Sequence, residues 1–267
     1  MRTIRELLDA DPAHAEGLSK TFSFIRDLHA YLDKTPSNPT EHSVETCRTC
    51  RGSGKVHLHP RSTGVLHPSS LGPDTCLQRL WYDVFEELKP LKVVDMKGQL
   101  IFGVGHQVHD LLQTYSEKMY GKEFKAEVPV IVDEIFLQGS ADGVRDMKHA
   151  RLMFEFKTIN RKGFESLGSG PKTAHTWQAT SYQAGLDLPF VVYVYFNKDT
   201  SDLLEFVRPF QADVWKRVQQ QAAKVLDAPT KGPGAIKADG EAISSYTCRD
   251  CPYNYGCPFS SHKPRRT

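Results

Sequence analysis

Two charged residues, Glu155 and Lys157, stand in an otherwise apolar stretch with a phenylalanine on either side of the glutamate. In a β-strand, side chains two residues apart point to the same face, so the charged pair is expected side by side, with Phe154 and Phe156 toward the core. Burying both charges costs desolvation energy unless a ligand compensates them. A divalent cation with an anionic substrate would compensate them, although an isolated Glu-x-Lys is more often a surface ion pair on an edge strand.

A second carboxylate, Asp142, lies among small residues in the stretch 139–143, where another group can approach the backbone closely; a turn aspartate is the simpler interpretation. Hydrolysis of a phosphodiester needs one or two hard cations to polarise the phosphate and to lower the pKa of the attacking water. Asp142 and Glu155 would supply oxygen ligands for such a cation. Lys157 would then orient the water or stabilise charge on the phosphate.

Further polar candidates lie on two expected helices. His109 falls in an expected helix over residues 97–120, where a lone histidine is more often a satisfied core residue than a ligand, and His106 competes with it. Gln178 and Tyr182 stand at positions i and i+4 on one face of an expected helix over residues 173–186.

Taken in chain order, these residues resemble the RecB-like branch of the PD-(D/E)XK nucleases: His109, Gly139-x-x-Asp142, Glu155-x-Lys157 and Gln178-x3-Tyr182. The resemblance implies that Mg²⁺ or Mn²⁺ is bound by His109, Asp142, Glu155 and the main-chain carbonyl of Phe156. It gives the catalytic set as Asp142, Glu155 and Lys157. It implies DNA contacts by the helix that carries Gln178 and Tyr182, with His175 just before them.

The cysteines favour a cluster. Six cysteines in an intracellular chain are metal or cluster ligands rather than disulfides. Four of them look like the iron–sulfur site of the CRISPR-associated and phage-encoded exonucleases of that branch, namely Cys76, Cys248, Cys251 and Cys257. The resemblance implies a [4Fe–4S] cluster, while a zinc tetra-thiolate stays open because four cysteines satisfy either metal. Cys76 is expected at the start of a helix, where the helix dipole favours a thiolate, although such a cysteine is by itself most often a buried small residue.

The other two cysteines form a knuckle, Cys47-x2-Cys50, followed by two glycines. It is similar to the CxxCxGxG repeat of the DnaJ zinc modules, which pair two knuckles where this chain has one. The pattern predicts zinc held by Cys47, Cys50, His57 and His59, with two reduced cysteines in a loop as the alternative.

Length and composition are those of a globular protein: 267 residues, 39% hydrophobic, and a formal net charge of +2. The chain has neither an apolar run of about 18 residues nor the apolar centre of a signal peptide. We expect a soluble, intracellular protein of the cytoplasm of a bacterium or a phage-infected cell. Its charge neither supports nor excludes a DNA substrate.

These residues must be positioned by alternating strands and helices. Strands are expected over residues 125–133, 135–137, 139–144, 152–158, 190–196 and 203–207, and further helices within residues 3–33, from 77 and over 212–226. The fold prediction is α/β, a PD-(D/E)XK restriction-endonuclease-like core with a mixed central sheet flanked by helices. Residues 1–75 would form a helical N-terminal extension with the knuckle, and residues 76–267 a nuclease domain with a Cys-rich C-terminal tail, closed by the four-cysteine cluster.

The function that the resemblance implies is a deoxyribonuclease, foremost an exonuclease on DNA ends or single strands, with endonuclease activity left open. Its setting would be phage recombination or CRISPR spacer acquisition, with the proteins of those processes as partners. The alternative is a DNA-end-binding or adaptor protein that keeps the fold without cleaving. A zinc interaction module would cover only residues 47–59.

Overall fold

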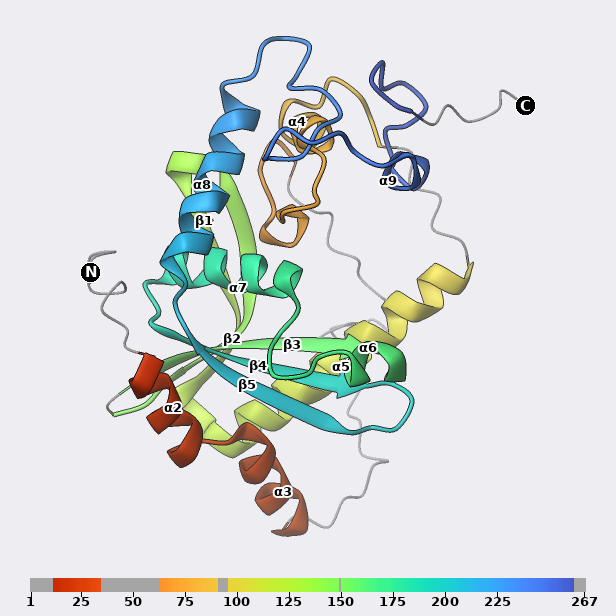
Figure 1. The fold of residues 1–267 in the computed structure, drawn as a ribbon. Helices are drawn as coiled ribbons and strands as arrows, with labels where there is room; N and C mark the ends of the chain where they lie inside the picture. Colours follow the sequence, from red (N-terminus) through yellow and green to blue (C-terminus); the bar gives the residue numbers. More distant parts are fainter. Residues whose placement is uncertain (1–11, 35–62, 91–95, 149, 262–267) are drawn as a thin grey trace.

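A five-stranded sheet whose strands follow the order of the sequence lies at the centre of the protein (Figure 1). The computed structural model describes residues 12–34, 63–90, 96–148 and 150–261. The strands are β1 (Phe124–Val132), β2 (Leu137–Asp146), β3 (Arg151–Ile159), β4 (Phe190–Asn197) and β5 (Leu203–Pro209). Only β3 and β4 pair in parallel, and the other neighbours are antiparallel. The prediction of a mixed sheet in an α/β protein is therefore confirmed.

One strand replaces two that the sequence predicts separately. The residues expected to start a strand at 135 instead end a 3-10 turn, η4 (Asp133–Ile135), and Phe136 follows with a left-handed φ of 51°. After that reversal, β2 runs without interruption over the predicted segment 139–144 and pairs with β1 as a hairpin. The interruption between the two strands of the hairpin thus lies before Leu137, whereas the sequence predicts an interruption after it.

The two faces of β3 and β4 bury different side chains, as their alternation predicts. On one face, Phe154 and Phe156 pack against Phe24, whose ring centroid lies 5.9 and 5.7 Å from theirs. This face is covered by the helices α2 (Pro12–Thr21), α3 (Phe24–Lys34) and α5 (Met96–Tyr120). Phe24 is fully buried, which stabilises the fold by roughly 2–3 kcal/mol.

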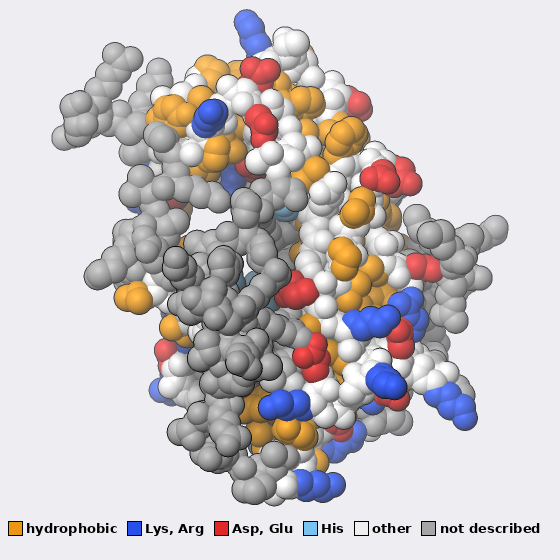
Figure 2. All heavy atoms as spheres, turned by 180° about the vertical axis from the view of Figure 1, so that it is seen from behind, with side chains coloured by type: hydrophobic (Ala, Val, Ile, Leu, Met, Phe, Trp, Pro, Cys, Tyr) orange, Lys and Arg blue, Asp and Glu red, His pale blue; other side chains and the backbone are white. Residues whose placement is uncertain are grey.

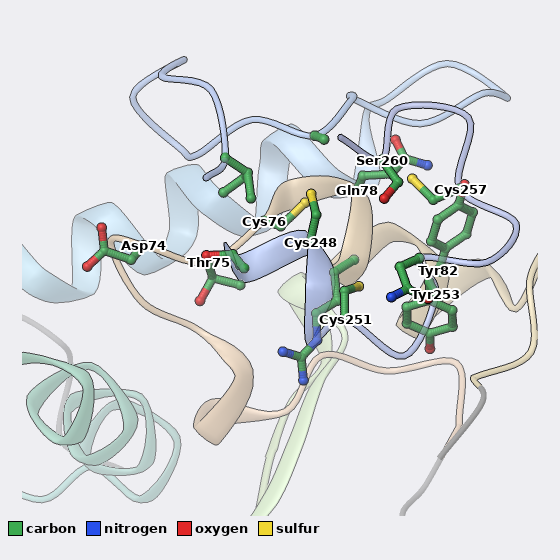
Figure 3. A pocket seen from close by; sticks show the side chains of 15 residues that line it. Asp74, Thr75, Cys76, Gln78, Tyr82, Cys248, Cys251, Tyr253, Cys257 and Ser260 are labelled. Carbon is green, nitrogen blue, oxygen red and sulfur yellow. The ribbon is translucent and has the colours of Figure 1, made fainter. Parts of the chain in front are cut away.

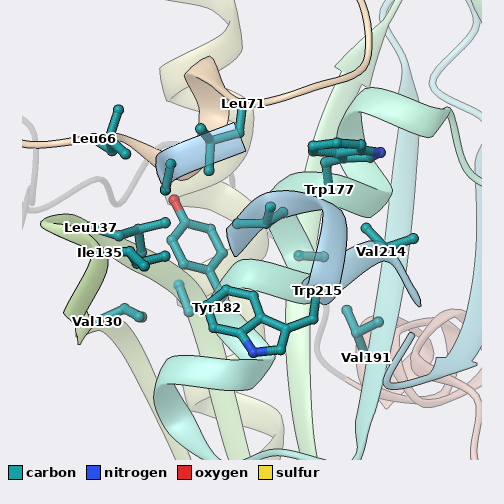
Figure 4. Packing of buried hydrophobic residues seen from close by; sticks show 14 of the residues in the cluster. Leu66, Leu71, Val130, Ile135, Leu137, Trp177, Tyr182, Val191, Val214 and Trp215 are labelled. Carbon is teal, nitrogen blue, oxygen red and sulfur yellow. The ribbon is translucent and has the colours of Figure 1, made fainter. Parts of the chain in front are cut away.

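The opposite face carries Glu155, Lys157 and two buried tyrosines of β4, Tyr193 and Tyr195. Helices α7 (Thr173–Leu186) and α8 (Ala212–Leu226) lie over it, and their tryptophans Trp177 and Trp215 belong to the main core (Figure 4). The parallel pairing of β3 and β4 requires a crossover. It runs through a short helix, α6 (Arg161–Glu165), and then through α7.

A third layer joins segments far apart in the sequence. The helices α4 (Leu77–Phe85) and α9 (Ser245–Arg249) lie near each other, away from the sheet (Figure 1). The buried amide of Gln78 holds the chain before α9, donating to the carbonyl of Lys231 and accepting from the N–H of Gly234. These bonds bring the C-terminal segment against the start of α4.

The chain before residue 76 also packs on the core. Leu66 is fully buried, and its main chain forms a bridge with Leu137 at the start of β2. The division into residues 1–75 and 76–267 stays a prediction. The knuckle of Cys47, Cys50, His57 and His59 lies outside the described residues. Within the described residues, no helix is long and apolar enough to cross a membrane.

Candidate nuclease site

The predicted site lies where β2 and β3 separate. Their ladder runs from Asp146 opposite Arg151 to Gly143 opposite Phe154, and the next pair, Asp142 and Glu155, is not part of it. The Asp142 carboxylate fills the gap, because its Oδ2 accepts a hydrogen bond of 2.6 Å from the main-chain N–H of Phe156. The parting of the strands thus makes room for two carboxylates at one point of the sheet.

Glu155 is fully buried, and Oε2 of its carboxylate has no hydrogen-bond partner. Its charge faces Lys157, whose Nζ forms an ion pair with Oε1. The same Nζ donates a 3.1 Å hydrogen bond to Oε1 of Gln178 on α7. The pair shares one face of β3, as the strand period predicts, and the buried carboxylate is left short of donors.

His109 reaches the same point from α5. Its Nδ1 lies 3.7 Å from Oδ1 of Asp142, and its ring stands edge-on to that of Phe156, with centroids 6.3 Å apart. His106 instead contacts the main chain of its own helix, since its Nδ1 is 2.8 Å from the carbonyl oxygen of Phe102 and the side chain is exposed. Of the two histidines, His109 is the one that faces the carboxylates.

Burial dominates the protonation of these groups. It raises the pKa of Asp142 to about 6 and that of Glu155 to about 7, although the Lys157 charge opposes both shifts. Burial, with Lys157, lowers the pKa of His109 to about 4. Burial alone would lower the pKa of Lys157, but the charges of Glu155 and Asp142 outweigh it and raise that pKa. At neutral pH, Lys157 is therefore protonated and His109 is neutral, while the two carboxyls release their protons close to that pH.

The donor set suits a hard cation. Two carboxylates and a neutral imidazole are ligands that Mg²⁺ and Mn²⁺ accept, and the buried Oε2 of Glu155 lacks a donor. In the part of the chain that the structure describes, no three His, Cys, Asp or Glu side chains stand close enough together to hold a metal ion. Cation binding therefore requires His109, Asp142 and Glu155 to come closer than they stand. These three side chains fit the ion in their chemistry, and they lie near one another.

Gln178 and Tyr182 are in contact, as the helix spacing predicts, with Nε2 of Gln178 3.4 Å from the Tyr182 hydroxyl. The ring of Tyr182 is only 5% exposed and packs in the main core between β2 and α8 (Figure 4). Its fit depends on Gly139, where an added Cβ would lie 2.8 Å from the ring. As placed, Tyr182 supports Gln178, and Gln178 is the member of the pair nearer to solvent.

His175 sits one turn before Gln178, with its Nδ1 2.7 Å from the hydroxyl of Tyr195 on β4. That hydroxyl also accepts the main-chain N–H of Lys172. The hydrogen bond between Nδ1 and the hydroxyl forms with either atom as donor, and when the hydroxyl donates, the ring hydrogen of His175 lies on Nε2. Burial, aided by Lys157 and Lys172, lowers the pKa of His175 to about 3, so this ring is a neutral N–H donor beside Lys157.

A cavity of about 130 Å³ is lined by all four cysteines of the predicted cluster, Cys76, Cys248, Cys251 and Cys257. Cys76 and Cys248 lie side by side there, although they are separated by more than 170 residues of sequence (Figure 3). All four are free thiols. A cavity of this size has far more room than the roughly 10–15 Å³ that one water molecule needs.

Cys76 lies at the start of a helix and is buried, as expected. It is the N-cap residue of α4, and the N–H groups of Gln78 and Arg79 do lower its pKa. Burial has the larger effect, however, and raises that pKa to about 11, because a thiolate without a cation is costly in this apolar surrounding. The helix start therefore does not by itself make Cys76 a thiolate.

Three residues of these sites escaped the sequence analysis. Arg79 lines the four-cysteine cavity, and its buried Nε has no hydrogen-bond partner. Gln113 and Glu127 are hydrogen-bonded to each other beside Asp142. Gln113 could have been found, because it stands four residues after His109 on the same helix face. Nothing in the local sequence marks Glu127 or Arg79, since their neighbours come from distant segments.

Searches of known proteins add a likeness of overall structure. No family model and no curated protein matches the chain. The crystal structure of SSO0001 is similar with a TM-score of 0.46 and 13% identity, over 90% of this chain and 96% of that one. An alkaline exonuclease, LHK-Exo from Laribacter hongkongensis, is similar with a TM-score of 0.48 and 11% identity, over 61% of this chain and 87% of that one. Its complex with dAMP has the same TM-score and coverage, with 13% identity.

Proposed function

We propose that this chain is a metal-dependent deoxyribonuclease that hydrolyses phosphodiester bonds at DNA ends or in single strands. The observation that carries the proposal is the buried Glu155 carboxylate, whose Oε2 has no hydrogen-bond donor at the point where Asp142, His109 and Lys157 converge. An ion pair with a purely structural role would not require the second carboxylate and the histidine beside it. The resemblance of the motif series supports a role in phage recombination or CRISPR spacer acquisition.

His109, Asp142 and Glu155 would hold Mg²⁺ or Mn²⁺, together with the main-chain carbonyl of Phe156. When bound, the ion supplies Lewis-acid polarisation of the phosphate and a lower pKa for the attacking water. Asp142 is held for this role by the N–H of Phe156. The raised pKa values of both carboxyls imply that protons leave as the cation binds.

Lys157 is positioned to act on the phosphate and the water, because Glu155 and Gln178 fix its Nζ from two sides. The neutral N–H of His175 adds a donor for a phosphate oxygen without a competing charge. Among the described residues on the face shown in Figure 2, lysine and arginine are interspersed with aspartate and glutamate rather than gathered in one patch. DNA recognition would thus depend on these local donors more than on a broad basic surface.

The four-cysteine cavity is proposed to hold a structural [4Fe–4S] cluster. In a zinc tetra-thiolate the sulfurs would stand about 3.8 Å apart, as tetrahedral Zn–S bonds of about 2.3 Å dictate. A [4Fe–4S] cluster holds its four cysteines farther apart, and the cavity of about 130 Å³ between these cysteines has room for it. The unpartnered Arg79 Nε offers a donor to the negative charge of a thiolate-bound cluster.

The test is cleavage of end-labelled single- and double-stranded DNA with Mg²⁺ or Mn²⁺, with EDTA, and with Glu155→Gln protein. Glu165→Gln, an exposed glutamate of α6, is the matched control. The proposal predicts metal-dependent products from wild type and from the control, and none with EDTA or from Glu155→Gln. DNA binding without cleavage at any metal concentration would replace the nuclease with the non-catalytic end-binding protein.

A further inference from the structure

Glu127 has an unusual backbone next to the site. It lies within β1 with a φ of 52°, a left-handed value that residues with a side chain rarely adopt. Its neighbours Ala126 and Val128 pair with Gly143 and Ala141, so Glu127 stands opposite Asp142 in the register. A glycine would adopt this conformation without strain, which points to a use for the glutamate side chain.

Each carboxylate oxygen of Glu127 accepts a hydrogen bond from a different element. Oε1 accepts from Nε2 of Gln113 on α5 at 2.7 Å, and Oε2 accepts from the Ser140 hydroxyl on β2 at 2.9 Å. The carboxylate therefore bridges the long helix and the strand that carries Asp142.

The amide of Gln113 uses its nitrogen twice. Besides the bond to Glu127, Nε2 donates at 2.9 Å to the main-chain carbonyl of Asp142, and the side chain is 1% exposed. Two acceptors fix which way the amide points, because its oxygen would be repelled at both places. Gln113 lies one helical turn after His109, so the position of this amide sets where His109 meets the carboxylates.

We propose that Glu127 is a positioning residue of the cation site, holding the Gln113 amide and thereby the His109 turn of α5 against the main chain of Asp142. This inference rests on the proposed cation site. Glu127 acts through its hydrogen bond and not as a ligand. The charge of Glu127 also acts on Asp142 and His109. The competing explanation is therefore that Glu127 affects the cation site through its charge and not through its hydrogen bond.

The two explanations separate in Glu127→Ala and Glu127→Gln. The alanine variant loses the acceptor, whereas the glutamine variant keeps an amide oxygen for Gln113 and loses only the charge. Mn²⁺ affinity is measured by calorimetry, and hydrogen exchange of the helix segment 105–116 is measured without metal. The expected result is a roughly 10–100-fold weaker affinity and faster exchange in Glu127→Ala. Glu127→Gln and the exposed control Glu134→Ala should stay within about threefold of wild type.

Gln113→Met gives an independent test, since it removes the bonds of the amide to Glu127 and to the main chain of Asp142. It should weaken Mn²⁺ binding by a similar factor, and the double variant with Glu127→Ala should be no weaker, because the two residues act through one contact. Wild-type affinity and exchange in Glu127→Ala would overturn the inference, and so would additive losses. A glutamine variant as weak as the alanine variant would assign the role to charge instead.

Failure of the proposed function has a different signature. If wild-type protein binds no Mn²⁺, the cation site is absent, whatever the variants do. The positioning role is then decided by the metal-free exchange alone. Faster exchange in Glu127→Ala but not in Glu127→Gln supports it, and equal exchange in the two variants overturns it.

Discussion

Asp142 substitutes for the strand pairing that β2 gives up, because its carboxylate accepts the Phe156 N–H at 2.6 Å. One oxygen of the carboxylate is thereby committed to the backbone of β3, and the other faces His109 at 3.7 Å. The orientation of a proposed cation ligand is thus set by the geometry of the sheet before any cation binds. This arrangement costs folding free energy, because the carboxylate is buried away from water.

That cost predicts a stability effect of Asp142→Asn. Burial raises the pKa of Asp142 from an ordinary value of about 3.9 to about 6 in the folded protein. Between these values the folded protein binds more protons than the unfolded chain, so this contribution to stability is lost as the pH rises through about 6. Asparagine does not titrate. Relative to the difference at pH 4, metal-free Asp142→Asn should gain about 2–3 kcal/mol over wild type by pH 7.5.

Urea unfolding across this pH range, in the presence of EDTA, measures the gain. The comparison with wild type cancels the opposite pH dependence of His109, whose pKa is lowered. Asp146→Asn, an exposed aspartate of the same strand, is the control and should show no such trend. A pH-independent difference would mean that Asp142 is not destabilised by burial. Added Mn²⁺ should stabilise wild type and leave Asp142→Asn unchanged.

Lys157→Met should separate chemistry from metal binding. The ammonium faces the phosphate and water in the proposed function, so its loss should lower the cleavage rate by about 10²–10³-fold. Mn²⁺ affinity should change far less, because Lys157 is not a ligand. Single-turnover cleavage and calorimetry on the same preparation provide both numbers, with the exposed Lys148→Met as control. Equal losses in rate and affinity would argue that Lys157 serves only to hold Glu155.

The two histidines of α5 should differ in effect. His109→Ala removes the imidazole facing Asp142 and should weaken Mn²⁺ binding by about tenfold or more. His106→Ala removes a side chain bonded to the carbonyl of Phe102 and should leave the affinity unchanged. Mn²⁺ titration followed by electron paramagnetic resonance compares them directly. The reverse ranking would move the ligand to His106.

The parts that the sequence predicts are those set by local periodicity. The predicted strand 152–158 corresponds to β3, and its period of two puts Glu155 and Lys157 on one face. The separation of β2 from β3 at Asp142 was not predictable, because it depends on register between distant segments. The helix expected over residues 97–120 corresponds to α5, but apolar side chains of its first turns are left exposed, with Leu100 at 64% and Val104 at 50%. Periodicity identifies an apolar face but not which part of it finds a partner.

The last prediction concerns the four cysteines. The proposed cluster joins Cys76 to Cys248 and so closes a loop of more than 170 residues. By analogy with a disulfide, closing a loop of that size restricts the unfolded chain by up to about 5 kcal/mol. Protein purified without oxygen should be brown, with broad absorption near roughly 400 nm from thiolate-to-iron charge transfer.

Cys251→Ser should bleach the protein and lower its melting temperature by on the order of 5–10 °C, while folded protein keeps its cleavage rate. The activity is spared because the cysteines line a cavity apart from the residues of the candidate nuclease site and hydrolysis transfers no electrons. Ser260 lines the same cavity but has no sulfur atom, so the Ser260→Ala protein should stay brown.

Arg79→Leu should keep the colour but shift the reduction potential, because the cluster loses a nearby N–H donor. Colourless wild-type protein carrying zinc at these cysteines would replace the cluster with a zinc site, and a bleached variant as stable as wild type would show that the cysteines do not hold the tail.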